Sequence, residues 1–239
     1  MNQQKEDNQE NGEERSSIIT LGEQDLVKIS NFVKKIPFQG FHGHVRAILS
    51  IKYSPNGKKI VTASADDTIR IWDANTGNPN LLIHGHLYGV SSIVYLKKGS
   101  IIASAGGDGI ICIWNADTGQ LIKKLKYHRH FIDLLAISPN GRYLASIGRD
   151  DKICIYDLIE ERLLITIKEG IIEPTCIDFS PDSNRIVTCD LDIGEEPSFD
   201  EERSRITVWD IISGNKLINI MPKDKKVSKV AFSPDGKHI

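Results

Sequence analysis

Six of the seven histidines of the chain occur in three His-x-His pairs, at 42/44, 84/86 and 128/130. Two histidines separated by one residue on a strand can ligate zinc, so these pairs are the first candidates for a chemical site. His44, His86 and His128, however, recur at intervals of 42 residues. So regular a spacing predicts equivalent positions in successive repeats, which separates the histidines in space. We therefore predict a structural role for them and no metal site.

Ser or Thr, His and Asp also recur together, and these are the residue types of a hydrolase triad. A catalytic nucleophile needs one exposed, convergent site, whereas three copies in register indicate architecture. The glycine-rich GGDG at 106–109 precedes no helix and so lacks the context of a phosphate-binding loop. We expect no catalytic residue, no cofactor and no enzymatic activity.

The composition excludes several classes of protein. The chain has 239 residues, 40% hydrophobic and 26% charged, which excludes a collagen, a coiled-coil rod and a wholly disordered chain. Its 30 basic and 32 acidic side chains nearly balance, so we expect no nucleic-acid partner. No apolar run is long enough to span a membrane, and the start lacks the apolar stretch of a signal peptide. The four cysteines form no CxxC pair, which predicts reduced thiols in the cytoplasm or the nucleus.

The elements that position these residues form a repeat. Three segments end alike: TASADDTIRIWD (62–73), ASAGGDGIICIWN (103–115) and ASIGRDDKICIYD (145–157). Trp72, Trp114 and Tyr156 are each 42 residues apart, and Trp209 follows Tyr156 by 53. An acidic insertion of about 11 residues, at roughly 193–203, therefore follows Asp192. A fifth unit opens with VSKVAFSPDG at 227–236.

Each unit is predicted to form four short strands, because β-branched segments alternate with turn sequences such as PNG and NTG. Four antiparallel strands per 40–45 residues are typical of a propeller blade. The units resemble the WD-repeat family over about residues 41–239, with Trp-Asp at 72–73 and 209–210 and Gly-His at 43–44 and 85–86. The resemblance implies an all-β propeller with four complete blades, at 45–83, 86–125, 128–167 and 170–220, and part of a fifth.

We expect residues 1–17 to form an acidic, disordered tail. We expect residues 18–239 to form an incomplete propeller, which is part of a seven-bladed ring. Residues 26–31 align with the third strand of the first repeat at minus 42, which predicts a degenerate third strand there and a fourth at 36–41.

The resemblance also implies a buried hydrogen-bond set of His, Ser or Thr, Asp and Trp in each blade. Carried over to this sequence, the first three sets are His44, Thr62, Asp66 and Trp72; His86, Ser104, Asp108 and Trp114; and His128, Ser146 and Asp150, with Tyr156 in place of Trp. The fourth is Thr188, Asp192 and Trp209, with Gly170 in place of His.

Members of the WD-repeat family resemble one another in lacking catalytic activity and in binding proteins or peptides on one face of the propeller. The resemblance therefore implies a scaffold that binds a protein or peptide partner, and no small-molecule substrate. On that face it places four candidate anchors, Arg46, Tyr88, His130 and Arg149. The first alternative is the sensor portion of a larger multidomain signalling protein. The second alternative is a metal-dependent propeller hydrolase.

Overall fold

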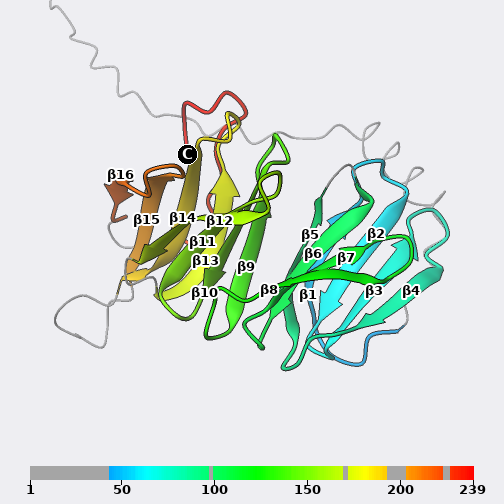
Figure 1. The fold of residues 1–239 in the computed structure, drawn as a ribbon. Helices are drawn as coiled ribbons and strands as arrows, with labels where there is room; N and C mark the ends of the chain where they lie inside the picture. Colours follow the sequence, from blue (N-terminus) through cyan, green and yellow to red (C-terminus); the bar gives the residue numbers. More distant parts are fainter. Residues whose placement is uncertain (1–42, 97–98, 169–171, 193–202, 223–226) are drawn as a thin grey trace, which may run out of the picture. The chain divides into compact units, whose positions relative to one another are not determined.

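The computed structural model describes residues 43–96, 99–168, 172–192, 203–222 and 227–239. These residues form sixteen strands in four four-stranded antiparallel sheets, and they contain no α-helix (Figure 1). None of their elements is a helix long and apolar enough to cross a membrane. The predicted acidic tail, the strands predicted at 26–31 and 36–41, and most of the acidic insertion lie outside the described residues.

Each sheet is one blade, and its strands pair in chain order. The first blade contains β1 (Ile48–Tyr53), β2 (Lys59–Ser64), β3 (Thr68–Asp73) and β4 (Pro79–His84). The second contains β5 (Val90–Leu96), β6 (Ile101–Gly106), β7 (Ile111–Asn115) and β8 (Leu121–Leu125). The third contains β9 (Ile132–Ile137), β10 (Tyr143–Gly148), β11 (Lys152–Asp157) and β12 (Arg162–Lys168). The fourth contains β13 (Ile172–Phe179), β14 (Arg185–Asp192), β15 (Arg203–Asp210) and β16 (Lys216–Ile220). The predicted four blades are confirmed.

The up-and-down order of the strands gives every blade two different ends. The loop that precedes the first strand and the turn between the second and third strands lie at one end, which we call the histidine end because it carries His44, His86 and His128. The turns between the first and second strands and between the third and fourth strands lie at the opposite end.

A serine turn joins the first two strands at the opposite end. Ser54 Oγ accepts a hydrogen bond from the Lys59 N–H at 2.9 Å and donates to Asn56 Oδ1 at 2.7 Å. Gly57 has a φ of +68°, which a glycine adopts without steric cost. The same turn recurs at Ser138, Ser180 and Ser233. The Ser-Pro-x-x sequences of the first, third and fourth blades therefore form the same turn, and so does the one that begins at Ser233.

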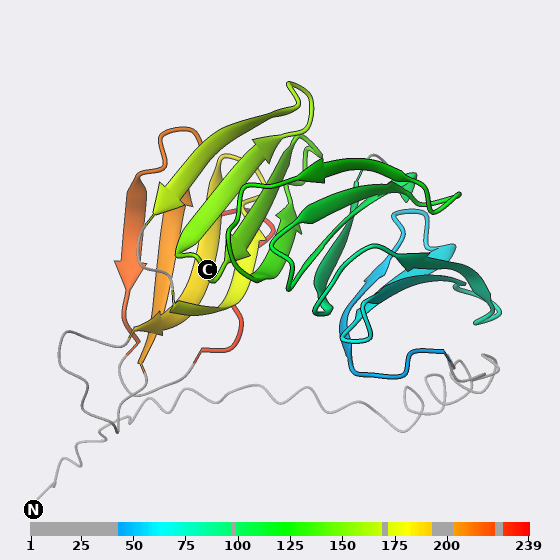
Figure 2. The same cartoon turned by 60° about the horizontal axis from the view of Figure 1, so that its bottom comes forward.

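The sheets follow one another in chain order (Figure 2), and the hydrophobic core lies between neighbouring sheets. Side chains of β2, β3 and β4 form one buried cluster with β5, β6 and β7, and similar clusters join the second blade to the third and the third to the fourth. Both faces of the middle strands are therefore covered, and Val61, Ile71 and Trp72 are completely buried. Consecutive residues of the middle strands are therefore buried, as along β10, where every residue is buried.

The prediction of a strand in the fifth unit is wrong for the described residues, since 227–239 contain none. The segment nevertheless lies against β13. The Phe232 N–H donates to Asp178 Oδ2 at 3.0 Å, as the Leu135 N–H donates to Ser92 Oγ at 3.0 Å between the second and third blades. No second strand pairs with it among the described residues, so the ladder that defines a strand does not form.

Candidate functional site

The first blade contains the complete hydrogen-bond set. His44 Nδ1 lies 2.9 Å from Asp66 Oδ2, and its Nε2 lies 2.7 Å from Thr62 Oγ1. The Trp72 indole N–H donates to the same Thr62 oxygen at 2.9 Å. In the tautomer that fits these distances, the Nδ1–H donates to the Asp66 carboxylate and Nε2 accepts a hydrogen bond from the Thr62 hydroxyl. The set ties the leading loop of the blade to its second and third strands.

The second blade repeats this geometry. His86 Nδ1 lies 3.1 Å from both Asp108 oxygens, and its Nε2 lies 2.7 Å from Ser104 Oγ. The Trp114 indole donates to Ser104 Oγ at 2.8 Å. The hydroxyl, the imidazole and the indole are buried. The Ser104 hydroxyl is thus buried, whereas a catalytic nucleophile needs to be exposed to its substrate.

The third blade keeps the histidine part of the set. His128 lies 2.7 Å from Asp150 Oδ1 and 2.8 Å from Ser146 Oγ. Burial opposes ionisation of Asp150, but hydrogen bonds from His128, the Arg129 N–H and Lys152 outweigh it and lower the pKa of Asp150 to about 2. Burial also lowers the pKa of His128. Both shifts favour a neutral imidazole beside an ionised carboxylate.

The fourth blade departs from the predicted set. The Trp209 indole donates to Thr188 Oγ1 at 3.0 Å, as expected. Asp192, however, lies at the end of β14 in register with Arg203 of β15, because these two strands extend beyond their equivalents in the other blades. Its assignment to the turn position of Asp66, Asp108 and Asp150 is therefore wrong, and Gly170 lies outside the described residues.

An ion pair that sequence reasoning missed lies in the fourth blade. The Arg205 guanidinium binds the carboxylate of Asp190, which is 1% exposed. The equivalent residue of the third blade is Gly148, where a Cβ would overlap the ring of His128. In the first blade Ser64 occupies this position although His44 is present, so a side chain here does not by itself exclude the histidine. An aspartate where the other blades have serine or glycine was the signal in the sequence.

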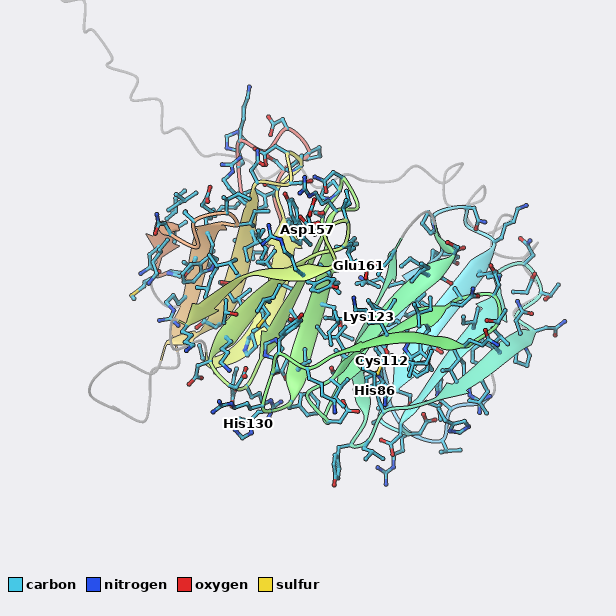
Figure 3. All side chains as sticks on the ribbon, in the orientation of Figure 1. His86, Cys112, Lys123, His130, Asp157 and Glu161 are labelled. Carbon is cyan, nitrogen blue, oxygen red and sulfur yellow. The ribbon has the colours of Figure 1, made fainter. Side chains whose placement is uncertain are left out.

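The histidine end forms a continuous row of loops and turns. The Gly89 N–H of the second leading loop donates to Asp67 in the turn of the first blade. A Cβ on Gly109, in the turn of the second blade, would lie 2.8 Å from the carbonyl of His130 in the third leading loop. The second and third leading loops therefore lie against the turns of the blades that precede them. Figure 3 shows His130 and His86 toward this end, and Asp157 and Glu161 toward the other.

The four predicted anchors all belong to this row, and all are exposed: Arg46, Tyr88, His130 and Arg149. Tyr88 is 80% exposed and has a φ of +66°, a conformation that costs energy for a bulky residue. Gly107, which leaves room for the Tyr88 carbonyl and Cβ, and the bond from Gly89 to Asp67 hold it there. The strained backbone keeps an aromatic ring in solvent.

The candidate anchor Arg149 is engaged by neighbouring side chains of the third blade. Its guanidinium Nη2 lies 3.0 Å from Asp133 Oδ1, and its Cζ lies 4.9 Å from the centre of the Phe131 ring. The bonds to Asp133 raise the pKa of Arg149. A partner at this point therefore meets a fixed, neutralised pair and not an isolated positive charge.

The histidine pairs do not converge. His84 is exposed whereas His86 is buried, and the described ranges contain no group of three His, Cys, Asp or Glu side chains placed to hold a metal ion. His42, the partner of His44, lies outside the described residues. The four cysteines are free and buried.

The family model described as "WD domain, G-beta repeat" (WD40) matches residues 35–73, 77–115, 119–157 and 166–192, more than half of the chain. The first three matches end with the last residue of β3, β7 and β11, and the fourth ends where the acidic insertion begins. No curated protein matches the chain.

Proposed function

The chain belongs to the WD40 (WD domain, G-beta repeat) family, whose domains generally mediate protein–protein interactions, and we propose that it is a non-catalytic scaffold that binds a protein or peptide partner at its histidine end. WD40 proteins are typically non-catalytic, and the buried Ser-His-Asp sets in the described blades support that role here. The proposal is based on the row of leading loops and turns, which offers a continuous surface on a rigid support.

The observation that carries the proposal is the conformation of Tyr88. Its ring is 80% exposed although burying an aromatic side chain is favourable, and its backbone is held in the left-handed region. The adjacent Leu87 is 64% exposed, and Val45 at the equivalent position of the first blade is 87% exposed. Exposed aromatic and aliphatic side chains on rigid loops are suited to be anchors of a partner.

The partner that fits this end carries mixed charge. Arg46 and Arg129 are exposed cations of the leading loops, and the Arg149–Asp133 pair lies in the same row. The acidic insertion at 193–203 leaves the turn between β14 and β15, which also belongs to the histidine end. We propose a partner that is basic where it meets the insertion, with binding that weakens as salt rises.

The test is capture of partners from the source cell with the wild-type protein and with Tyr88→Ala and Arg149→Ala, followed by titration of a captured protein. Both substitutions should weaken binding more than deletion of residues 193–202, because residues on rigid blades can be fully desolvated. Lys58→Ala is the matched control, since Lys58 is exposed at the opposite end. Unchanged affinity of both variants would remove the histidine end as the binding surface.

The alternative is a propeller that acts as the sensor portion of a larger multidomain signalling protein. An immunoblot of the source cell separates the two, because a native band far above 26.7 kDa would favour the larger protein. We also propose the cytoplasm or the nucleus as the compartment, supported by the four free cysteines. Microscopy of the tagged protein tests this point.

A further inference from the structure

The junction between the second and third blades departs from the repeat at four positions. Tyr156 stands where the other blades have Trp72, Trp114 and Trp209. Glu161 stands where they have Gly77, Gly119 and Gly214. Lys123 stands where they have Leu81, Ile165 and Ile218. Tyr127 stands where the first and second leading loops have Gly43 and Gly85.

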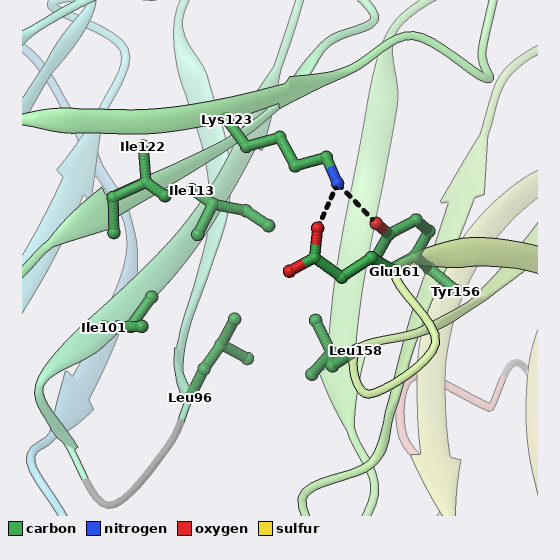
Figure 4. Close-up of a pocket in the computed structure, with 8 residues that line it drawn as sticks. All are labelled: Leu96, Ile101, Ile113, Ile122, Lys123, Tyr156, Leu158 and Glu161. Atoms are coloured by element: carbon green, nitrogen blue, oxygen red, sulfur yellow. Dashed lines mark hydrogen bonds and ion pairs between the residues drawn. The ribbon is translucent and has the colours of Figure 1, made fainter.

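The first three departures meet one another. Lys123 Nζ, on β8 of the second blade, lies 2.8 Å from Glu161 Oε2 and 3.0 Å from the Tyr156 hydroxyl of the third blade (Figure 4). Glu161 has a φ of +52°, where the equivalent glycines have values of +72° to +74°. A strained glutamate is thus kept at a glycine position, and its side chain reaches across the junction to a lysine.

The fourth departure lies beside Tyr156. In the second blade a Cβ on Gly85 would overlap the Trp114 ring, so that indole fits beside a glycine. At the third blade Tyr127 occupies the glycine position, and its ring centre lies 6.1 Å from that of Tyr156. A glycine is not a general requirement for the indole, because the fourth blade keeps Trp209 with Glu169 at this position of the sequence.

A hollow lies beside this polar group, at the opposite end from His44, His86 and His128. Five aliphatic side chains line it: Leu96, Ile101, Ile113, Ile122 and Leu158. The space in it that a water-sized group can occupy is about 70 Å³, and the hollow is open to solvent. Lys123 and Glu161 stand on one side of it, and both are partly exposed. We call this hollow the junction pocket.

We propose that the junction pocket binds the aliphatic side chain of a peptide segment, whose backbone carbonyl accepts a hydrogen bond from Lys123. The walls are isoleucine and leucine, which favour a branched aliphatic group over a polar one. An ammonium group has three N–H donors, and the bonds to Glu161 and Tyr156 use two. Lys123 and Glu161 form an ion pair of opposite charges at the edge of the hollow.

The site is independent of the proposed site at the histidine end, because its lining residues lie at the opposite end of the blades. It adds a second contact point to a scaffold, for a segment with leucine, isoleucine or methionine as its anchor. If one of the two proposed sites is disproved, the proposal for the other site still stands. The experiment below distinguishes the two outcomes.

The experiment is an NMR titration of the protein labelled at its isoleucine δ1-methyl groups. The probe is N-acetyl-L-leucine N-methylamide, which carries one leucine side chain and two carbonyl acceptors, and the control probe is the glycine equivalent. We expect saturable shifts of the Ile101, Ile113 and Ile122 methyls with the leucine probe and none with glycine. Ile122→Trp, at a half-exposed position of the mouth, should fill the pocket and abolish the shifts.

The substitution Lys123→Leu introduces leucine, as at Leu81 of the first blade, and removes the ammonium group that donates to the carbonyl of the probe. The affinity for the leucine probe should therefore fall about tenfold. Tyr88→Ala, at the histidine end, should leave probe affinity unchanged even if it abolishes capture of a protein partner. The isoleucine methyl spectrum of each variant reports folding directly. Equal shifts with both probes, no shift at the solubility limit of the leucine probe, or shifts that persist in a folded Ile122→Trp variant would overturn the proposal.

Discussion

Removal of the Asp150 carboxylate tests whether the histidine sets brace the blades. Asp150 accepts hydrogen bonds from His128 Nδ1 at 2.7 Å, the Arg129 N–H at 3.0 Å and Lys152 Nζ at 3.0 Å. Its side chain is 5% exposed, and that of His128 is completely buried. Asp150→Ala therefore leaves an imidazole N–H inside the protein with no acceptor.

The expected cost comes from these three bonds. A buried donor that loses its partner costs about 1–3 kcal/mol, and the more exposed Lys152 pair adds at most about 1 kcal/mol. The Arg129 N–H is at the surface and can bind water. The free energy of unfolding should fall by about 2–3 kcal/mol, a large part of the stability of a typical domain.

The assay is urea unfolding followed by circular dichroism. With a slope of about 2 kcal/mol per molar urea, the midpoint should fall by about 1 M. Asp150→Asn retains an acceptor for His128 and should cost less. The matched control is Asp133→Ala, which removes the carboxylate of the exposed Arg149 pair and should cost at most about 1 kcal/mol.

Two results would refute the reasoning. If Asp150→Ala and Asp133→Ala shift the midpoint equally, burial of the histidine set contributes nothing beyond a surface pair. If Asp150→Ala unfolds at the wild-type midpoint but loses a partner, the residue belongs to a binding site and its assignment as a brace is wrong.

Three further predictions concern stability. Arg205→Thr leaves the carboxylate of Asp190 buried and unpaired, which should cost about 3–5 kcal/mol, and adding Asp190→Ser should recover part of this in urea unfolding. Gly106→Ala would force a Cβ into the carbonyl of Gly89, so this variant should lose its cooperative thermal transition, while Gly57→Ala, where the space is open, keeps it. The pKa of His128 in the folded protein lies below its ordinary 6.5, so the unfolded chain binds more protons near and below this pH. The urea midpoint should therefore fall as the pH drops below about 6.5. The substitution His128→Gln should reduce this pH dependence.

The period of the sequence was enough to predict the blades and three of the four buried sets. Strand positions follow from local alternation and turn chemistry, and Trp72, Trp114 and the three histidines recur at one interval. Equivalent positions in a repeat have equivalent surroundings, so a residue type that recurs in register can be assigned without coordinates. The same reasoning failed for Asp192, because the insertion lengthens β14 and β15 and moves this residue from a turn into a strand.

Only the tertiary structure shows the contacts between different repeats, because the repeat period does not predict which side chains of two repeats meet. Lys123 and Glu161 are 38 residues apart in the chain and belong to different blades, and only packing brings the lysine to the glutamate at 2.8 Å. The ion pair between Asp190 and Arg205 could not be predicted from the sequence, because the other blades have no equivalent pair at that spacing. The sequence by itself determined the strands of each blade and their order, since these follow from alternation and turn residues that recur in every repeat. The junctions depend on side chains from two repeats that differ from their equivalents, and their shape follows only from the packed fold.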